Sequence, residues 1–430
     1  MRWRHWLMSL VIGVSGSAAW GEGYEVWLVD QSNSFGKAYG GRIFVFDGQK
    51  AARGVEGDEA PEAVIDLGAA TSDLCLARTG ANPVRPHMVV FNSTETHAAL
   101  SFVASGHVVF FDARTRQPIE CFRMQAGAGG ARQAHAVWPT NDDQYMLVAN
   151  QNGKLFERIR TDYATNTFTY EPAASLNLAT CTTPNGFPCQ DPVLRPDNAP
   201  ICPFTASPGV PAFVTLRGGG MLLVDPYTTP ISIVAEYDRA TIAGNGCGLI
   251  EARGWVYFNA GGGTANNLDQ FSVYRLPRSG FSPLNPPNTP VVQLIYNDED
   301  HHRDAHGVAT SKHERYVWMY DRAANVAEIF DGHSGAHLST VPITHPATTD
   351  ASPDLVALAP NGVVHFVSLR GPNPLSGDPH SSTGAVPGLG IVRLTEGGLN
   401  GRLEKVIPIT NRDSGGVERA DAHGIRIRHK

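Results

Sequence analysis

The chain has 430 residues, of which 42% are hydrophobic and only 17% are charged, and it contains 45 Gly and 30 Pro. This composition excludes an intrinsically disordered chain and a coiled coil, which need more charge and fewer turn-forming residues. The 34 basic and 41 acidic residues give a formal net charge of −7 without a Lys/Arg cluster, so the electrostatic signature of a nucleic-acid-binding protein is missing.

Residues 1–21 have the pattern of a secretory signal peptide. Arg2 and Arg4 precede a short apolar run, and small residues suited to a cleavage site follow it. A buried N-terminal strand is the alternative interpretation. No later stretch approaches the length of apolar sequence that spans a bilayer. We therefore expect the mature chain, residues 22–430, to be periplasmic or secreted and to have no membrane span.

The six cysteines fit an exported protein, because oxidising compartments allow disulfides to persist. The segment CTTPNGFPC (residues 181–189) is bracketed by two cysteines that would close a short loop. Cys75 and Cys121 flank one of the repeats described below and are a second candidate pair. Cys202 and Cys247 lie on neighbouring repeats, and the sequence leaves open whether they form a disulfide or remain free thiols.

A short pattern recurs along the chain, in which a small or polar residue and a His precede an apolar run. It occurs as RPHMVVF, QAHAVWP, DAHGVAT and DAHGIRI, which contain His87, His135, His306 and His423. After the first three copies, a polar turn such as PTNDDQ leads into a second β-rich run, and a third run follows. Strands rich in Val, Phe and Tyr that are repeated between polar turns are typical of the blades of a β-propeller.

Weaker copies place Cys202, Cys247 and Asp354 at the position of the His, with insertions that we expect to form loops on one face. The last copy is followed by a single strand, IRIRHK, whereas the mature N-terminus opens with two runs that resemble second and third strands. We therefore predict an all-β fold, a seven-bladed β-propeller whose ring is closed when the C-terminal strand joins the N-terminal blade. Such closure removes an open sheet edge.

The segment WPTNDDQYMLVANQNGKLFERI (residues 138–159) resembles the repeat of the YVTN/lactonase-like seven-bladed propellers. In that group a proline and a polar turn precede an apolar strand that ends in Asn. The segment HGVATSKHERYVWMYDRAANVAEIFD is a looser version of the same repeat. The resemblance implies the fold rather than an activity, because propellers carry many unrelated functions. The catalytic pattern of the lactonase members has no residue-by-residue match here.

Equivalent positions on the innermost strands of a propeller converge near its axis, so the aligned residues are expected to form one ring. Imidazole, thiolate and carboxylate groups together suit a transition metal ion. The predicted metal ligands are His87, His135, His306, His423, Asp354 and Cys247. Asp304 and Asp421, each two residues before a His, are predicted to orient the imidazoles. The alternative is that each His bonds only to backbone or to trapped water.

The spread of His over several blades is similar to that of copper enzymes built on seven-bladed propellers, such as nitrous oxide reductase and thiocyanate dehydrogenase. This resemblance implies copper as the favoured metal ion. The segment NDEDHHRDAHG places His301 and His302 beside acidic residues at the expected channel rim. It is either a site that captures an ion or substrate, or a solvated acidic loop.

The sequence has no GxSxG, HExxH or CxxCH motif, which disfavours a serine hydrolase, a zincin and covalently attached haem. A periplasmic oxidoreductase acting on a small molecule is our first prediction, with a small-molecule ligand or a redox protein as partner. The alternatives are a non-catalytic binding scaffold and a metal-assisted lactonase or lyase with Asp354 or His306 as base. We expect a monomer, because a closed ring shields its sheet edges.

Overall fold

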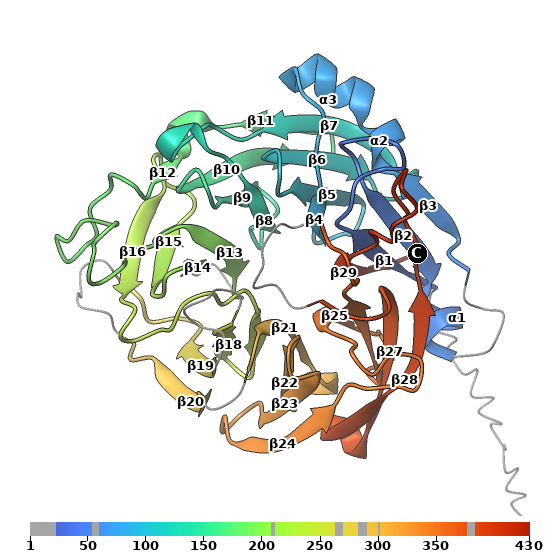
Figure 1. Cartoon of the computed structure of the whole chain (residues 1–430). Coiled ribbons are helices and arrows are strands. Elements are labelled where there is room, and N and C mark those ends of the chain that lie inside the picture. The colour runs from blue at the N-terminus through green and yellow to red at the C-terminus, as the bar shows by residue number, and fades with distance from the viewer. Residues whose placement is uncertain are drawn as a thin grey trace, which may run out of the picture.

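Seven antiparallel sheets are arranged as blades around one axis in the computed structural model (Figure 1). The structure describes residues 23–53, 60–207, 211–262, 270–282, 290–299, 302–375 and 383–430. Six sheets have four strands, and one has a short fifth strand. The predicted seven-bladed β-propeller is confirmed. The predicted signal peptide, residues 1–21, lies outside the described residues.

The strands of each blade follow one another from the axis outward. The innermost strands are β4 (Pro86–Phe91), β8 (Ala134–Pro139), β13 (Pro200–Thr205), β17 (Leu249–Ala252), β21 (Ala305–Thr310), β25 (Pro353–Leu358) and β29 (Ala422–His429). The second strands are β1 (Tyr24–Asp30), β5 (His97–Phe102), β9 (Tyr145–Asn150), β14 (Ala212–Leu216), β18 (Trp255–Ala260), β22 (Tyr316–Asp321) and β26 (Val364–Leu369).

The third strands are β2 (Arg42–Asp47), β6 (His107–Asp112), β10 (Leu155–Asp162), β15 (Met221–Asp225), β19 (Phe271–Pro277), β23 (Val326–Asp331) and β27 (Gly388–Thr395). The outer strands are β3 (Ala63–Asp66), β7 (Gln117–Arg123), β11 (Thr167–Tyr170), β12 (Leu176–Asn177), β16 (Ser232–Tyr237), β20 (Gln293–Asp298), β24 (His337–Pro342) and β28 (Asn400–Pro408). Three short helices, α1 (Gly48–Arg53), α2 (Leu67–Ala70) and α3 (Ser72–Thr79), are inserted around β3.

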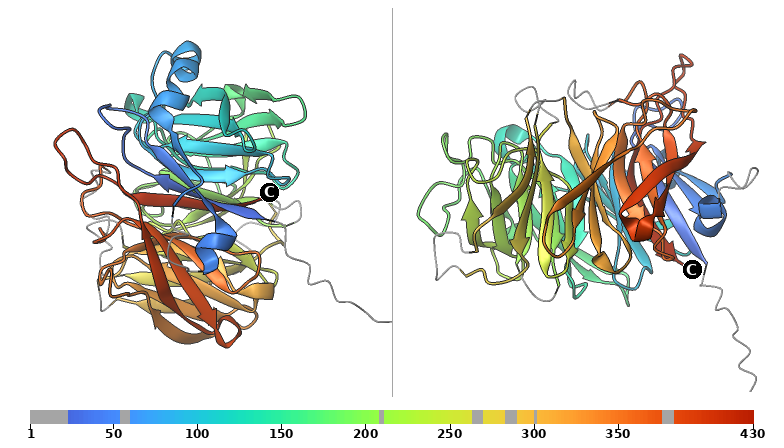
Figure 2. Two further views of the ribbon diagram at one scale, coloured as in Figure 1. Left: turned by 90° about the vertical axis from the view of Figure 1, so that its right-hand side faces the viewer. Right: turned by 90° about the horizontal axis from the view of Figure 1, so that it is seen from below.

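The ring is closed by β29, which pairs antiparallel with β1 from Tyr24↔His429 to Asp30↔Ala422. The first blade is therefore built from both ends of the sequence, as the split repeat predicts, and the C-terminus lies beside this blade (Figure 1). Turned through 90°, the ring is a thick disc with loops projecting from its two faces (Figure 2).

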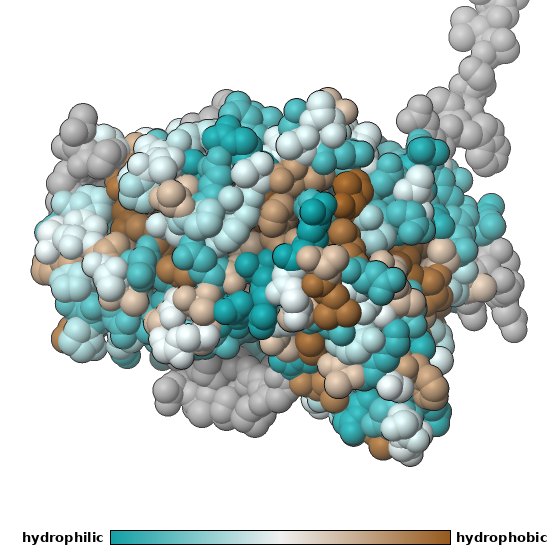
Figure 3. Space-filling model, turned by 90° about the horizontal axis from the view of Figure 1, so that it is seen from above, coloured by the Kyte–Doolittle hydropathy of each residue, from teal (hydrophilic) through white to brown (hydrophobic). Residues whose placement is uncertain are grey.

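The core lies between neighbouring blades, because each sheet is covered on both sides. Second strands such as YVWMYD and HAALSF are buried along their whole length, so most of their residues are apolar instead of alternating with polar ones. Trp318 and Tyr320 are fully buried in one of these inter-blade clusters. Seen from above, the outer edge of the disc shows mostly hydrophilic residues with narrow hydrophobic strips between them (Figure 3).

Three disulfides join the six cysteines. Cys75 on α3 is bonded to Cys121 on β7, and a second bond closes the loop 181–189, so both candidate pairs are confirmed. The third bond joins Cys202 to Cys247 and settles the alternative that the sequence left open. Three disulfides fit a protein that folds in an oxidising compartment. None of the described helices is long and apolar enough to cross a bilayer.

Candidate metal centre

The four predicted histidines meet at the axis. The ring centroids of His87 and His423 are 3.8 Å apart, and the two imidazoles are stacked with 11° between their planes. His135 lies 4.5 Å from His87, and His306 lies 5.3 Å from His423, again between centroids. His87, His306 and His423 are buried and His135 is partly exposed. The structure thus brings together residues that are hundreds of positions apart in the chain.

A β-bulge turns each of these side chains toward the axis. The register of β4, β8, β21, β25 and β29 with the second strand shifts at the His or Asp354 position. A bulge adds a residue to one strand and re-aims its side chain, and bulges are frequent beside active sites. The aligned residues therefore point into the channel instead of alternating with the pleat.

Polar residues of the second strands fix these bulges to the next blade. Ser101 Oγ accepts a hydrogen bond from Met88 N at 3.2 Å and donates to the carbonyl of His135 at 3.2 Å. Ser368 links Leu355 N to the carbonyl of His423 in the same way, at 2.9 and 2.6 Å. Sequence reasoning missed these residues, although a polar side chain in an otherwise apolar strand (HAALSF, VHFVSL) is a visible signal.

Hydrogen bonds fix the tautomer of two of the imidazoles. His423 Nδ1 donates to Asp354 Oδ2 at 2.7 Å, and His135 Nδ1 donates to the carbonyl of Ile201 at 2.9 Å. Donation from Nδ1 leaves the lone pair on Nε2, which is the arrangement of metal-binding histidines whose second nitrogen is held by a carboxylate or a carbonyl. Asp354 therefore orients the ring of His423. The sequence pattern predicts this orienting role for Asp304 and Asp421 instead.

Several buried polar atoms at the axis have no hydrogen-bond partner among the residues that the structure describes. They are both ring nitrogens of His87, Nε2 of His306 and of His423, and Oδ1 of Asp354. His306 Nε2 lies 3.1 Å from this Oδ1, but without hydrogen-bond geometry. Buried polar atoms are nearly always paired, so such a cluster needs an explanation. His306, Asp354 and His423 offer three ligand atoms within 4.8 Å of one another, and this donor set fits a divalent transition metal.

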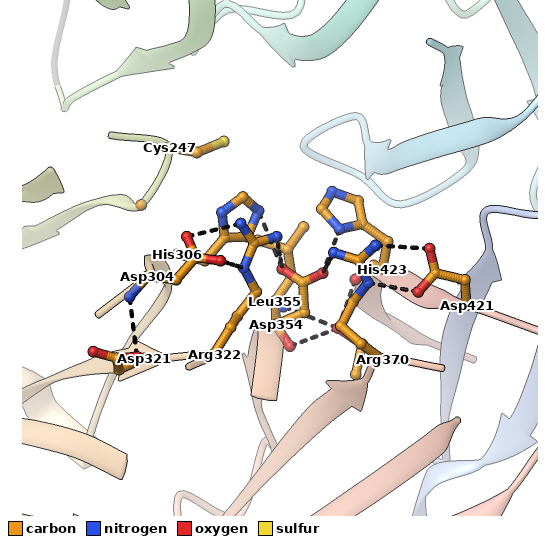
Figure 4. A network of polar contacts seen from close by, with 12 residues as sticks. Cys247, Asp304, His306, Asp321, Arg322, Asp354, Leu355, Arg370, Asp421 and His423 are labelled. Carbon is orange, nitrogen blue, oxygen red and sulfur yellow. Dashed lines mark hydrogen bonds and ion pairs between the residues drawn. The ribbon is translucent and has the colours of Figure 1, made fainter. Parts of the chain in front are cut away.

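A row of alternating buried charges passes beneath the imidazoles (Figure 4). Asp304 binds Arg322 with two hydrogen bonds of 2.9 and 3.0 Å, and Arg322 lies 3.5 Å from Asp354. Arg370 lies 3.3 Å from the other oxygen of Asp354 and binds Asp421 at 2.5 and 2.8 Å. The prediction that Asp304 and Asp421 orient imidazoles is therefore corrected: their carboxylates bind the arginines, because a guanidinium fork fits a carboxylate better than one N–H does.

Burial determines the protonation of the histidines. It lowers the pKa of His87 and of His306 well below the usual value, and like charges on the neighbouring rings and arginines act in the same direction. Burial, with a smaller contribution from His423, lowers the pKa of His135 to about 4. Burial alone would raise the pKa of Asp354, but the nearby His423, His306 and arginines hold it well below its usual range. At neutral pH the three rings are neutral and the carboxylate is charged, as metal ligands must be.

Cys247 lies beside the ring, within 4.8 Å of ligand atoms of His135 and Cys202. Its sulfur is bonded to that of Cys202, so it carries no thiolate charge and we remove it from the ligand set of the oxidised protein. At the predicted rim, His302 is exposed, and His301 lies outside the described residues. Asp298 in the same segment pairs with the buried Arg303 at 2.6 Å, so part of this acidic cluster is structural.

The fold and the axial cluster define the class of this protein, a seven-bladed β-propeller with polar side chains gathered at its channel. Solved structures with this fold include a hypothetical selenium-binding protein from Sulfolobus tokodaii, with a TM-score of 0.63 at 9% identity over 94% of this chain and 93% of that one. The periplasmic gluconolactonase of Pseudomonas aeruginosa matches with a TM-score of 0.55 at 12% identity, over 94% and 99% of the two chains.

A putative 6-phosphogluconolactonase from Bacteroides fragilis is similar to the same degree, with a TM-score of 0.55 at 11% identity over 94% of this chain and 98% of that one. At these identities the likeness shows the fold alone. No protein-family model matches the chain, and no curated protein is similar to it in sequence.

Proposed function

We propose that this protein is an exported propeller whose axial histidines hold a transition metal ion, with copper as the favoured ion, and that it acts as a periplasmic oxidoreductase on a small molecule. The observation that carries the proposal is the cluster of buried, unpartnered donor atoms on His87, His306, His423 and Asp354. A metal ion held by His306, His423 and Asp354 would satisfy a buried ligand atom of each of these residues.

The residues of the centre divide into ligands and supports. His306 and His423 would bind the metal through ring nitrogens, since they and Asp354 offer ligand atoms within 4.8 Å of one another, and His87 and His135 would complete the set. Asp354 would hold the ring of His423 and offer Oδ1, which lies 3.5 Å from Arg322. When bound, a copper ion supplies redox cycling and polarisation of a coordinated molecule. The row of two arginines and three aspartates carries a net charge of −1, which favours a cation at the axis.

Copper is favoured because the donors are imidazoles without a thiolate, and because copper(II) stands highest in the affinity order of divalent first-row metals. Export is supported by the three disulfides and by the likeness to a periplasmic propeller, and it agrees with the signal peptide expected at residues 1–21. The low pKa of Asp354 argues against the lactonase or lyase alternative with this residue as the base, because such a carboxylate is weakly basic.

Metal analysis of the purified protein tests the proposal. We expect the wild type, after loading with copper and removal of excess ion, to hold about one equivalent, and the double variants His135→Ala/His306→Ala and His87→Ala/His423→Ala to hold little. The matched control is His333→Ala/His345→Ala, which changes two histidines outside the axial cluster and should retain the metal. Paramagnetic resonance distinguishes copper from zinc. A folded wild type that remains empty after loading would favour the non-catalytic scaffold.

A further inference from the structure

A cavity of about 420 Å³ continues along the axis from the metal centre. Met88, Gly248 and Leu355 line it, and each directly follows a residue of the axial ring in the sequence. Farther along, the walls are apolar side chains of the innermost strands, including Trp138 and Phe204. The size and the apolar walls are those of a small-molecule site.

One cation, Arg426, lines this cavity and has no anionic partner in the described part of the chain. Glu251, the other charged residue of the lining, is already bound to Arg278 at 2.5 Å and to the backbone N of Ser207 at 2.6 Å. Among the described residues no carboxylate pairs with Arg426, whose guanidinium lies 4.9 Å from the centre of the Trp138 ring.

Arg426 is half-buried, whereas the fully buried arginines of the fold all have a carboxylate partner. Each of the following is paired with a carboxylate: Arg158, Arg195, Arg303, Arg322 and Arg370. Burial lowers the pKa of Arg426 to about 10, so its guanidinium is still charged at neutral pH. A partly desolvated charge without a partner is costly, and the cost is recovered when a ligand brings the missing anion.

The guanidinium is also accessible from a second direction. A neighbouring cavity of about 380 Å³ shares Trp138 and Arg426 with the first and extends past Asn92 and Thr140. Its two carboxylates, Glu95 and Asp143, already accept hydrogen bonds from the backbone N of His429 and of Ser93. Arg426 therefore lies where two cavities meet, three residues along β29 from His423. A molecule held here would have one end on the cation and its body in the apolar space below the histidines.

We propose that the axial cavity binds a small organic carboxylate, whose anionic group pairs with Arg426 and whose apolar body packs against Trp138 and Phe204. A carboxylate matches the two parallel donors of a guanidinium, and an indole face suits a flat apolar body. The binding does not need the metal ion. It deepens the proposed function by naming the substrate class that reaches the centre from this side, and to that extent it rests on that function.

Titration of the metal-free, full-length mature protein with 2-naphthoate tests this inference, with 2-naphthamide as the uncharged probe of similar shape. We expect 2-naphthoate to bind more tightly than the amide and to change the tryptophan fluorescence. Arg426→Gln should weaken naphthoate binding by about 10- to 100-fold, the range for a lost charged hydrogen-bond pair, and leave the amide within about twofold. Arg426→Lys should retain part of the affinity.

Two further variants keep the test decisive. Arg402→Gln removes an exposed arginine and should leave both probes unaffected. Trp138→Leu should weaken both probes, because it changes the shared apolar wall and not the charge. Equal binding of the two probes by the wild type, or unchanged naphthoate binding by folded Arg426→Gln, would overturn the inference. Either result leaves the metal proposal standing, since the metal content is measured separately.

Discussion

The substitution Asp354→Asn removes the central charge of the axial row while nearly keeping the side-chain volume. Asp354 is fully buried, accepts the hydrogen bond of His423 at 2.7 Å and lies 3.3 and 3.5 Å from two guanidinium groups. Breaking a buried ion pair from one side costs about 3–5 kcal/mol. Because Arg322 and Arg370 each keep an aspartate partner, we expect the lower end, about 3 kcal/mol.

Urea unfolding of the metal-free protein measures this loss, and titration of copper against a competing chelator measures the affinity. An amide oxygen can still accept from His423, so the ring stays oriented and the copper affinity should fall by about 10- to 100-fold. Asp197→Asn is the control, since the Asp197–Arg217 pair is about one third exposed and should contribute less than about 1 kcal/mol. A variant with wild-type stability and wild-type affinity would refute the charge row as a support of the centre.

Three further outcomes are expected. The double variant Cys202→Ser/Cys247→Ser should lose up to about 4 kcal/mol of stability, by the chain-entropy relation for a separation of 45 residues. It should keep its copper. A lower metal content in this variant would show that a sulfur atom is a ligand. The metal-free protein should lose stability as the pH falls from about 6.5 toward 4, because His135 (pKa about 4) stays neutral in the folded state and takes up a proton near pH 6.5 once unfolded. The free energy of unfolding should fall by as much as about 3 kcal/mol over this range, which urea unfolding at several pH values measures. In His135→Ala the free energy of unfolding should depend less steeply on pH. Ser368→Ala should cost about 1 kcal/mol and weaken copper binding, whereas the exposed Ser414→Ala should change neither.

The architecture could be predicted because each blade repeats the same local pattern. The two DAHG segments and the weaker copies at Cys202 and Cys247 all fall on or directly before an innermost strand. The pattern survives because every blade faces the same environment, an apolar neighbour on each side and a channel at one edge. The placement of β29 in the first blade followed from counting strands at the two ends of the sequence.

The site could be predicted only in part, because its partners are set by distances across blades. Cyclic symmetry brings the imidazoles together, but it does not say which group each carboxylate binds. Arg322 and Arg370 directly follow second strands and bind Asp304 and Asp421, which are 18 and 51 positions away in the sequence. A guanidinium competes better for a buried carboxylate than a single ring N–H does. Whether Cys202 and Cys247 form a disulfide or stay free thiols also depends on the distance between them in the fold, which the sequence does not give.

The strand β29 has two duties that cannot be separated. The same short strand pairs with β1 to complete the first blade, and it also places His423 and Arg426 at the channel. Detaching this strand would therefore dismantle the centre, and an ion gripped by rings from several blades would resist the detachment. Metal binding should therefore stabilise the closed ring against unfolding, and the unfolding temperature should rise with the logarithm of the free ion concentration.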